Sequence, residues 1–445
     1  MYDADRFIAE LEQRNPAQPE FIQAVREMVV SIVDLVNESP AYINARILER
    51  ITEPDRVFMF KVEWEDDNGD VQMNRGYRVQ FNNAHGPYKG GLRFHANVTL
   101  GGLKFLAFEQ TFKNSLTMLP MGGGKGGSDF NPKGKSDNEI LRFCRSFMTE
   151  LQKYIGPDTD VPAGDIGVAG REIGYLYGQY KRLRGENTGV LTGKGTNWGG
   201  SLIRPEATGF GAVYYAEAML KEAGDQLAGK TIALSGFGNV AWGVAIKASQ
   251  LGAKVITLSG PDGYVLDEKG VGTREHWDYM LELRASNNDV VAPYAEKFGA
   301  KFFPGRRPWE VKAEMAFPCA IQNEVEENDA KCLIENSYKY VIETSNMGCT
   351  SEAVTTLQRA KIGFAPGKAA NAGGVAVSGL EMSQNSMKLK WSAEEVDEKL
   401  KRIMRDIHAM GLRYGRRDDG YVDYMRGSNI ASFVRVADAM LDLGY

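Results

Sequence analysis

Residues 231–241 read Thr-Ile-Ala-Leu-Ser-Gly-Phe-Gly-Asn-Val-Ala, and this stretch decides the expected fold. Its apolar first half predicts a strand, and residues 240–251 predict the helix that follows. Gly236, Gly238 and Ala241 have the Gly-x-Gly-x-x-Ala spacing of a dinucleotide-binding turn. The first glycine permits the tight turn, the second lets the backbone approach a pyrophosphate, and the alanine lets helix and strand pack closely. Because a helix N-terminus also attracts phosphate, the stretch predicts nucleotide binding.

The chain around this turn alternates between helical and strand-like segments from residue 208 onward. A helix is predicted over 211–223, and apolar runs follow at 231–235, 254–259, 301–303, 315–317, 340–343 and 362–365. Strands that alternate with helices indicate a parallel sheet. We therefore expect an α/β fold with a Rossmann-like coenzyme domain over residues 201–423. Further helices are predicted at 372–387, 393–410 and 430–443.

The first 200 residues follow a different pattern. Helices are predicted over 3–50, and strands over 57–64 and 71–81 are joined by the Asp-Asp-Asn-Gly turn at 66–69. Helices follow at about 100–115, 140–154 and 171–183. This antiparallel start predicts a second α/β domain with a mixed sheet, residues 1–200, which a C-terminal helix at 424–445 rejoins. We expect a cleft between the two domains, with hinges near residue 200 and after Ser378.

Composition excludes several classes of protein. A net charge of -5 without a run of five Lys or Arg argues against nucleic acid and acidic lipid as partners. No stretch of 18 apolar residues occurs, so no membrane span is expected, and the polar start is not that of a signal peptide. The four cysteines form no Cys-x-x-Cys pair, which indicates reduced thiols in a cytoplasmic protein. The four histidines have no ligand spacing, so no metal is expected.

A second glycine-rich stretch, residues 117–129, surrounds Lys125 with five glycines. Glycine lets backbone approach a ligand closely, so we interpret Lys125 as the chemical centre, although composition alone favours a mobile surface loop. Asp165 is presented by a Pro/Gly turn after a predicted strand. Gln110 and Lys113 share a helix face because they are three residues apart, and an ordinary solvated face is the alternative for this pair.

The coenzyme type is suggested by the end of the second strand in the Rossmann-like unit. Asp262 can bond the 2′-hydroxyl of an adenine ribose and repel a 2′-phosphate, although a plain turn residue is as good an interpretation. No Arg or Lys lies between Val255 and Glu268. NAD is therefore favoured over NADP, unless a base from elsewhere in the chain reaches the site.

These stretches together resemble the small hexameric glutamate dehydrogenases of the Glu/Leu/Phe/Val dehydrogenase superfamily, over almost the whole chain. The residues that carry the resemblance are Tyr-Arg-Val-Gln-Phe at 77–81, Gly-Pro-Tyr-Lys-Gly-Gly-Leu-Arg-Phe at 86–94, Lys-Phe-Leu-Ala-Phe-Glu-Gln-Thr-Phe-Lys-Asn at 104–114, Leu-Pro-Met-Gly-Gly-Gly-Lys-Gly-Gly at 119–127, Asp-Val-Pro-Ala-Gly-Asp-Ile-Gly-Val at 160–168, Arg-Pro-Glu-Ala-Thr-Gly at 204–209 and Lys-Ala-Ala-Asn-Ala-Gly-Gly-Val at 368–375.

The resemblance implies a role for each matching residue. The catalytic residues would be Lys125 as base and Asp165 as acid. Substrate contacts would come from Lys89 and Ser378 for the side-chain carboxylate, Gln110 and Lys113 for the α-carboxylate, and the Gly164 backbone for the amino group. Coenzyme contacts would come from Thr208, Gly236, Phe237, Gly238, Asn239, Val240, Asp262 and Asn346. Phe237 and Pro261 resemble the NAD-preferring members.

The activity implied by the resemblance is the reversible oxidation of L-glutamate to 2-oxoglutarate and ammonium, with NAD as the favoured coenzyme, NADP as the alternative, and no metal. The N-terminal domain would bind the substrate and build a homohexamer. Lys125 can act as a base only if its pKa falls well below the ordinary value of about 10.4. We expect burial and the charges of Lys89 and Lys113 to lower it.

Departures from the family pattern and rival functions remain open. His85, Ile321 and the Gly348-Cys349 pair differ from what the family usually carries, and Ile321 adds doubt to contacts near the nicotinamide. One rival is another amino-acid dehydrogenase, and another is a catalytically silent nucleotide-binding regulator. A phosphate-loop NTPase is disfavoured because Gly126, rather than Ser or Thr, follows Lys125.

Overall fold

Two units make up the chain in the computed structural model, which describes residues 1–286 and 290–444. The first unit contains Met1–Leu202, Ser378–Val396 and the chain from Asn429 onward, and the second contains Ile203–Val377 and Asp397–Ser428. The segment Ser378–Val396 differs from the expected division, which put it in the coenzyme domain. It joins the first unit because the buried carboxylate of Glu381 binds the backbone amides of Gly193 and Lys194.

The first unit is built on a five-stranded mixed sheet, as predicted, with the order β1-β2-β4-β3-β5. Its strands are β1 (Arg56–Glu65), β2 (Val71–Asn82), β3 (Tyr88–Phe94), β4 (Gly123–Ser128) and β5 (Asp160–Gly164). Strand β2 pairs antiparallel with β1 and β4, whereas β3 pairs parallel with β4 and β5. The sequence patterns did not predict β3 and β4 as strands, and both carry candidate site residues.

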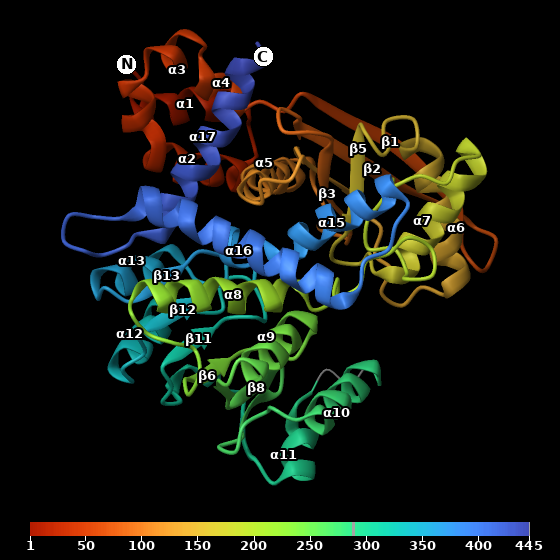
Figure 1. Ribbon diagram of the computed structural model, residues 1–445. Coiled ribbons are helices and arrows are strands. Elements are labelled where there is room, and N and C mark those ends of the chain that lie inside the picture. The colour runs from red at the N-terminus through yellow and green to blue at the C-terminus, as the bar shows by residue number, and fades with distance from the viewer. Residues whose placement is uncertain (287–289, 445) are drawn as a thin grey trace. The chain divides into compact units, whose positions relative to one another are not determined.

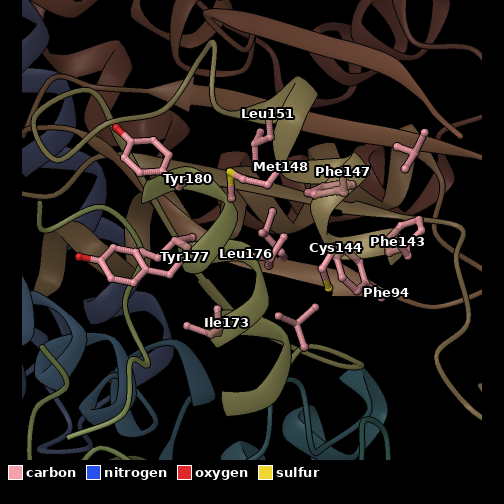
Figure 2. Close-up of a cluster of buried hydrophobic side chains, with 14 of the residues drawn as sticks. Phe94, Phe143, Cys144, Phe147, Met148, Leu151, Ile173, Leu176, Tyr177 and Tyr180 are labelled. Atoms are coloured by element: carbon pink, nitrogen blue, oxygen red, sulfur yellow. The ribbon is translucent and has the colours of Figure 1, made fainter. Parts of the chain in front are cut away.

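Helices of the segment Met1–Leu202 complete this unit. They are α1 (Ala4–Arg14), α2 (Pro19–Glu38), α3 (Pro40–Asn44), α4 (Ile47–Ile51), α5 (Leu100–Leu116), α6 (Asp137–Leu151) and α7 (Gly170–Arg184). Helix α5 packs on β4, and α6 packs on β1 and α7 (Figure 1). Figure 2 shows the aromatic and aliphatic core between α6, α7 and the sheet, where the rings of Phe94, Phe143 and Phe147 meet edge to face or tilted. The packing of this core fixes the relative positions of the strands that carry the candidate site residues.

The second unit contains the predicted parallel sheet, with the order β13-β12-β11-β6-β7. Its strands are β6 (Thr231–Leu234), β7 (Lys254–Val255), β11 (Met315–Phe317), β12 (Tyr340–Ile342) and β13 (Gly363–Ala365). Its helices are α8 (Ala207–Glu222), α9 (Asn239–Gln250), α10 (Arg274–Ala285), α11 (Ala292–Phe298), α12 (Glu327–Glu335), α13 (Ser351–Arg359), α14 (Gly367–Ala370) and the 3-10 turn η1 (Pro308–Glu310). Residues of α15 (Gly373–Met387), α16 (Ala393–Gly415) and α17 (Tyr424–Asp442) are divided between the two units.

The prediction was wrong for one run of the second unit. Residues 301–303 were expected in the parallel sheet, but β10 (Lys301–Pro304) pairs antiparallel with β9 (Gly263–Leu266). Strand β9 in turn pairs antiparallel with β8 (Thr257–Gly260), so the predicted strand 254–259 is split between two sheets. The short turn at Pro261-Asp262 explains this, because it connects neighbouring antiparallel strands, whereas a parallel pair needs a long crossover.

No helix of the described residues is both long enough and apolar enough to cross a membrane.

Candidate active site

Lys125 lies on a buried strand of glycines and not on a mobile loop, which corrects the composition-based alternative. All six residues of β4, Gly-Gly-Lys-Gly-Gly-Ser, are buried. A Cβ atom on Gly123 would lie 2.0 Å from Thr111 Oγ1 of α5, and one on Gly90 of β3 would lie 1.7 Å from the Gly124 carbonyl oxygen. The glycines are therefore required because neighbouring backbone and helix fill the space that a side chain would need.

The Lys125 ammonium contacts the second predicted catalytic residue directly. Its Nζ lies 3.2 Å from Asp165 Oδ2, and the lysine side chain is only 8% exposed. Asp165 follows the last residue of β5, as predicted, and its Oδ2 also accepts a hydrogen bond of 2.7 Å from Arg93 Nε. The carboxylate thus bridges two cations, of which Arg93 had been given no role by sequence reasoning.

Strand geometry explains why Arg93 reaches Asp165. Lys89, Gly91 and Arg93 alternate along β3, so they share one face of the sheet. A Cβ on Gly91 would lie 2.8 Å from Asp165 Cβ and 3.2 Å from Lys125 Nζ, so this glycine leaves the room that the pair occupies. Had residues 88–94 been predicted as a strand, their alternation would have pointed to Arg93.

The site shifts the pKa of both predicted catalytic groups. Burial lowers the pKa of Lys125, and Arg93 and Arg78 lower it further, while Asp165 opposes them. Burial alone would raise the pKa of Asp165, but the charges of Lys125 and Arg93 and their hydrogen bonds leave it lowered overall. The sequence-based expectation of a lowered lysine pKa agrees with this direction. It had named Lys89 and Lys113 as the cations, whereas Arg93 and Arg78 act here.

The predicted substrate residues lie on four elements, which are β3, α5, β5 and α15. Lys89 is 1% exposed, and its Nζ donates a hydrogen bond of 2.8 Å to Thr192 Oγ1. Gln110 and Lys113 lie one turn apart on α5, and Gln110 Nε2 donates to Asn114 Oδ1 at 2.6 Å. Gly164 ends β5 beside Asp165, and Ser378 is buried on α15. Gln110 also approaches Gly90, the residue after Lys89, which brings α5 against this part of β3.

The predicted dinucleotide turn has the geometry that its sequence indicates. Gly236 follows β6 with φ +80°, a conformation that favours glycine, and its N–H donates to Ser259 Oγ at 2.8 Å. Helix α9 begins at Asn239, with Gly238 as its N-cap and Ala241 fully buried against neighbouring elements. Phe237 is buried, and Val240 is half-buried in the first turn of α9. These residues fit a dinucleotide, because a helix N-terminus and a side-chain-free turn meet at one point.

A basic residue missed by sequence reasoning reaches this turn. Arg284 belongs to α10, and its guanidinium would lie 2.6 Å from a Cβ built on Gly238. A distant helix therefore places a basic side chain at the turn, where the sequence prediction had considered only the second strand. No local signal could have revealed Arg284, because only the fold brings α10 to the turn.

Asp262 has structural partners that sequence reasoning did not foresee. Its carboxylate accepts hydrogen bonds of 3.0 Å from Val291 N–H and 2.9 Å from Ala292 N–H at the start of α11. These bonds give the Asp262 carboxylate a structural role at the start of α11.

Two other predicted coenzyme residues lie close to glycine-rich backbone. Thr208 stands on α8, and its Oγ1 would be 2.5 Å from a Cβ on Gly374. Asn346 Oδ1 accepts a hydrogen bond of 2.8 Å from Asn371 Nδ2. Among the described residues, no group of three His, Cys, Asp or Glu side chains is arranged to hold a metal ion.

Comparison with known proteins agrees with this arrangement. The family of Glu/Leu/Phe/Val dehydrogenases matches through its dimerisation domain over residues 54–182 and through its dehydrogenase domain over residues 199–444. The NAD-specific glutamate dehydrogenase of Bacteroides fragilis is 61% identical over 441 residues, covering 99% of both chains. The NADP-specific glutamate dehydrogenase of Haemophilus influenzae is 55% identical, covering 99% of this chain and 98% of its own.

Solved structures give the same result. A glutamate dehydrogenase structure matches with a TM-score of 0.97 at 56% identity, covering 99% of both chains. The lysine and aspartate described above thus stand in a fold shared over essentially the full length. The chain belongs to the glutamate, leucine, phenylalanine and valine dehydrogenase family.

Proposed function

We propose that this chain catalyses the reversible oxidative deamination of L-glutamate to 2-oxoglutarate and ammonium, with hydride transfer to NAD or NADP. The observation that carries the proposal is the buried contact of 3.2 Å between Lys125 and Asp165. A base and a carboxylate in contact, both with altered pKa, are what a proton-coupled oxidation of an amine needs.

Asp165 and Lys125 would divide the proton transfers. Asp165 begins as a carboxylate because its pKa is lowered, so it can accept the proton that the substrate ammonium must lose before oxidation. The bound nicotinamide would supply the hydride acceptor. Lys125 acts in its deprotonated form, which its lowered pKa makes more accessible, and removes a proton from the water that adds to the oxidised substrate carbon. Asp165 finally returns its proton to the amine nitrogen. As the C–N bond breaks and the ketone forms, the hydroxyl proton leaves with the ammonia as ammonium, and Lys125 releases its proton to solvent. Gln110 and Lys113 are proposed to hold the α-carboxylate, and the Gly164 backbone the amino group.

Lys89 and Ser378 are proposed to select glutamate over aliphatic amino acids, because a carboxylate removed from water needs charge pairing. Lys89→Leu is expected to lower kcat/KM for glutamate by roughly 10²-fold, the effect of removing one partner of a buried charge pair. Initial rates with a panel of glutamate, leucine and phenylalanine measure this. Unchanged glutamate kinetics in the variant would refute the role.

The same substrate panel separates the rival functions. Another amino-acid dehydrogenase would oxidise an aliphatic or aromatic substrate faster than glutamate. A silent regulator would oxidise none, but the Lys125–Asp165 contact and the buried Lys89 argue against it. Glutamate is favoured because related enzymes for apolar substrates need an apolar pocket where this chain has Lys89.

NAD is our proposed preferred coenzyme, with Phe237 and the lack of a base near β8 in its favour. Arg284 argues for NADP, because its guanidinium lies beside the turn glycine Gly238. Asp262 supports NAD only if its carboxylate can serve a ribose while capping α11. Thr208, Asn239, Val240 and Asn346 remain proposed contacts for either coenzyme.

Initial rates of glutamate oxidation with NAD and NADP side by side test both function and preference. We expect the higher kcat/KM with NAD in the unaltered protein. Arg284→Ala should then lower the activity with NADP more than that with NAD, because a guanidinium favours the extra phosphate. Equal losses with both coenzymes would show that Arg284 does not distinguish them, and a higher rate with NADP would reverse the stated preference.

A homohexamer is the proposed assembly. Val57 and Met59 on β1 and Val71 and Met73 on β2 are exposed, and the register of the hairpin puts them on one face of the sheet. Exposed apolar surface of this kind marks a contact with another chain, and the family of this N-terminal segment is described as a dimerisation domain. L-Glutamate, 2-oxoglutarate and ammonium are the proposed small-molecule partners.

The cytoplasm is our proposed location. The four cysteines are free thiols, and Cys144, Cys319 and Cys349 are buried. Unpaired thiols are typical of a reducing compartment.

A further inference from the structure

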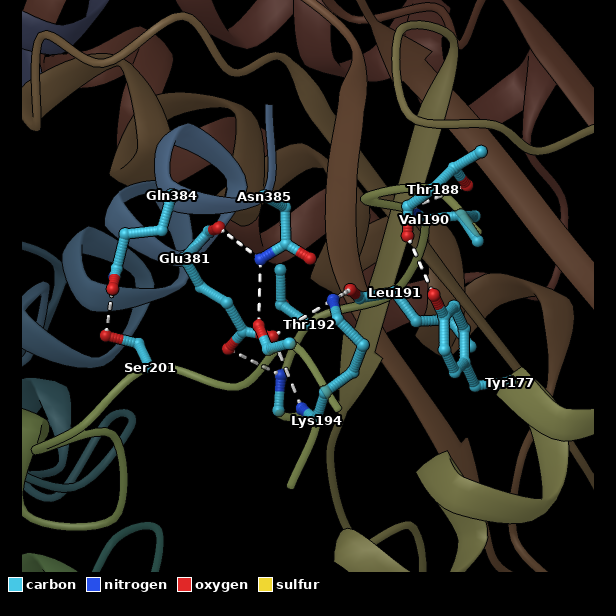
Figure 3. A network of polar contacts seen from close by, with 12 residues as sticks. Tyr177, Thr188, Val190, Leu191, Thr192, Lys194, Ser201, Glu381, Gln384 and Asn385 are labelled. Carbon is cyan, nitrogen blue, oxygen red and sulfur yellow. Dashed lines mark hydrogen bonds and ion pairs between the residues drawn. The ribbon is translucent and has the colours of Figure 1, made fainter. Parts of the chain in front are cut away.

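A buried ion pair that the proposed chemistry does not use lies beside the proposed substrate pocket. Lys194 Nζ is 3.1 Å from Glu381 Oε1, and both side chains are fully buried. The pair lies within the first unit, where Lys194 follows the loop residue Thr192 and Glu381 stands on α15. Figure 3 shows Glu381 pointing from its helix toward Lys194 and the loop. A buried pair of this kind adds little stability over apolar residues of the same size, so another role is worth seeking.

Both oxygens of Glu381 are engaged by the loop. Gly193 N–H donates to Oε2 at 3.1 Å, and Lys194 N–H donates to Oε1 at 3.3 Å. Lys194 Nζ also donates to the Leu191 carbonyl oxygen, so the side chain folds back over its own loop (Figure 3). The carboxylate and the ammonium together fix the backbone on both sides of Thr192.

Thr192 connects this loop to Lys89. Its Oγ1 accepts the hydrogen bond from Lys89 Nζ, and its N–H donates to the Pro162 carbonyl oxygen of β5 at 2.9 Å. Strand β5 pairs with β3 at Lys89 itself, through Val161. The threonine is therefore fixed by β5 on one side and by Glu381 on the other, and its hydroxyl sets the direction of the Lys89 ammonium.

Glu381 also belongs to the helix that carries Ser378. The two residues are three apart on α15, so they lie on the same side of the helix. One carboxylate thus ties the loop that orients Lys89 to the helix that presents the Ser378 hydroxyl. Burial lowers the pKa of Lys194 while Glu381 opposes this shift, which agrees with a pair enclosed away from water.

We propose that Lys194 and Glu381 are positioning residues for substrate selection, which hold Thr192, Lys89 and Ser378 in register for the side-chain carboxylate of the substrate. This inference rests on the proposed function, because it assigns Lys89 and Ser378 to that carboxylate. Neither Lys194 nor Glu381 touches the substrate in this proposal. Their effect is confined to substrates that carry a second carboxylate.

The test compares glutamate with L-norvaline, which lacks the side-chain carboxylate, in the full-length protein. Glu381→Gln and Lys194→Met are expected to lower kcat/KM for glutamate at least 10-fold, mainly through KM, and to change that for norvaline less than 2-fold. Asn385→Ala is the matched control, because Asn385 joins the same helix to Gly199 O at 2.8 Å and donates to the backbone carbonyl of Glu381 rather than to its carboxylate. The control should leave the ratio of the two substrates unchanged.

Equal losses with both substrates, or no loss with either, would overturn the proposal. If the ion-pair variants do not fold, Thr192→Val removes the hydroxyl while keeping the shape, and the same selective loss is expected, with recovery in Thr192→Ser. A Thr192→Val protein with unselective or unchanged kinetics overturns it equally. If the unaltered protein fails to oxidise glutamate, the proposed function itself has failed, which separates the two results.

Discussion

Lys125→Ala is expected to lower kcat for glutamate oxidation by about 10³-fold, within the range that loss of a general base produces. Lys125 belongs to β4, which pairs with β2 and β3 and packs against α5. Among the described residues, no other buried lysine side chain contacts Asp165. Alanine fits this space without a clash, so the fold and the coenzyme turn in the second unit should be unaffected. Stopped-flow measurement of coenzyme reduction, with coenzyme binding measured in parallel, checks this.

The pH dependence of kcat/KM gives an independent test of the same residue. Only the neutral amine can accept a proton, so activity should rise with pH as Lys125 deprotonates. Burial, Arg93 and Arg78 lower this pKa against the opposing Asp165, so the rise should occur below the ordinary lysine value of about 10.4. This rise of kcat/KM with pH should be absent from the residual activity of Lys125→Ala.

A matched control is available on α5. Lys104 and Lys125 are each 6% exposed when the whole residue is counted, and burial lowers the pKa of the Lys104 ammonium too. Its Nζ donates to Asn15 Oδ1, away from Asp165. Lys104→Met should therefore keep both kcat and the pH profile of the parent. Turnover in Lys125→Ala near that of the control would rule out the lysine as the base.

Asp165→Ser should abolish turnover. The expected loss in kcat is about 10⁴-fold, the upper end of the range for removal of an acid–base group. The serine cannot accept the substrate proton as a carboxylate does. It also leaves Lys125 and Arg93 as neighbouring cations without the charge that both contact. Coenzyme binding should remain measurable by fluorescence, because the Gly236 turn belongs to the other unit.

Asp165→Asn refines this experiment, because an amide oxygen can still accept the Arg93 hydrogen bond without the negative charge. Both variants should be inactive if the carboxylate moves protons. Activity in the asparagine variant within 10-fold of the parent would instead assign Asp165 a purely structural task as the acceptor for Arg93.

Local patterns predicted the parts of the structure that depend on local chemistry. The strand, turn and helix around Gly236 were found because their glycine spacing and apolar run lie within one short stretch. The Asn-Gly turn before β2 was found for the same reason. Strand β4 was missed because glycine is depleted in strands, so its composition suggested a loop. Its pairing with β2 and β3 outweighs that preference.

Contacts that depend on the order of the strands could not be read from the chain. Arg93 reaches Asp165 because β3 pairs with β5, which is two strands further along the chain. Arg284 reaches Gly238 from a helix beyond three further strands. Asp262 was recognised as an acid beside the second strand, but its bonds to Val291 and Ala292 required the fold of α11.

The packing of β4 has a consequence for how the barrier to reaction is lowered. A strand in which glycines flank Lys125 on both sides, paired on both edges and packed against a helix, has little room to shift. The Lys125 amine is therefore preorganised for the reaction, and little reorganisation free energy has to be supplied when the reaction takes place. A single methyl group at Gly126 would lie 2.7 Å from the Tyr77 carbonyl oxygen and would displace the backbone next to Lys125. A displacement of about 1 Å can cost 10²-fold in rate. The glycines beside Lys125 therefore affect the reaction rate strongly, although they take no part in the chemistry.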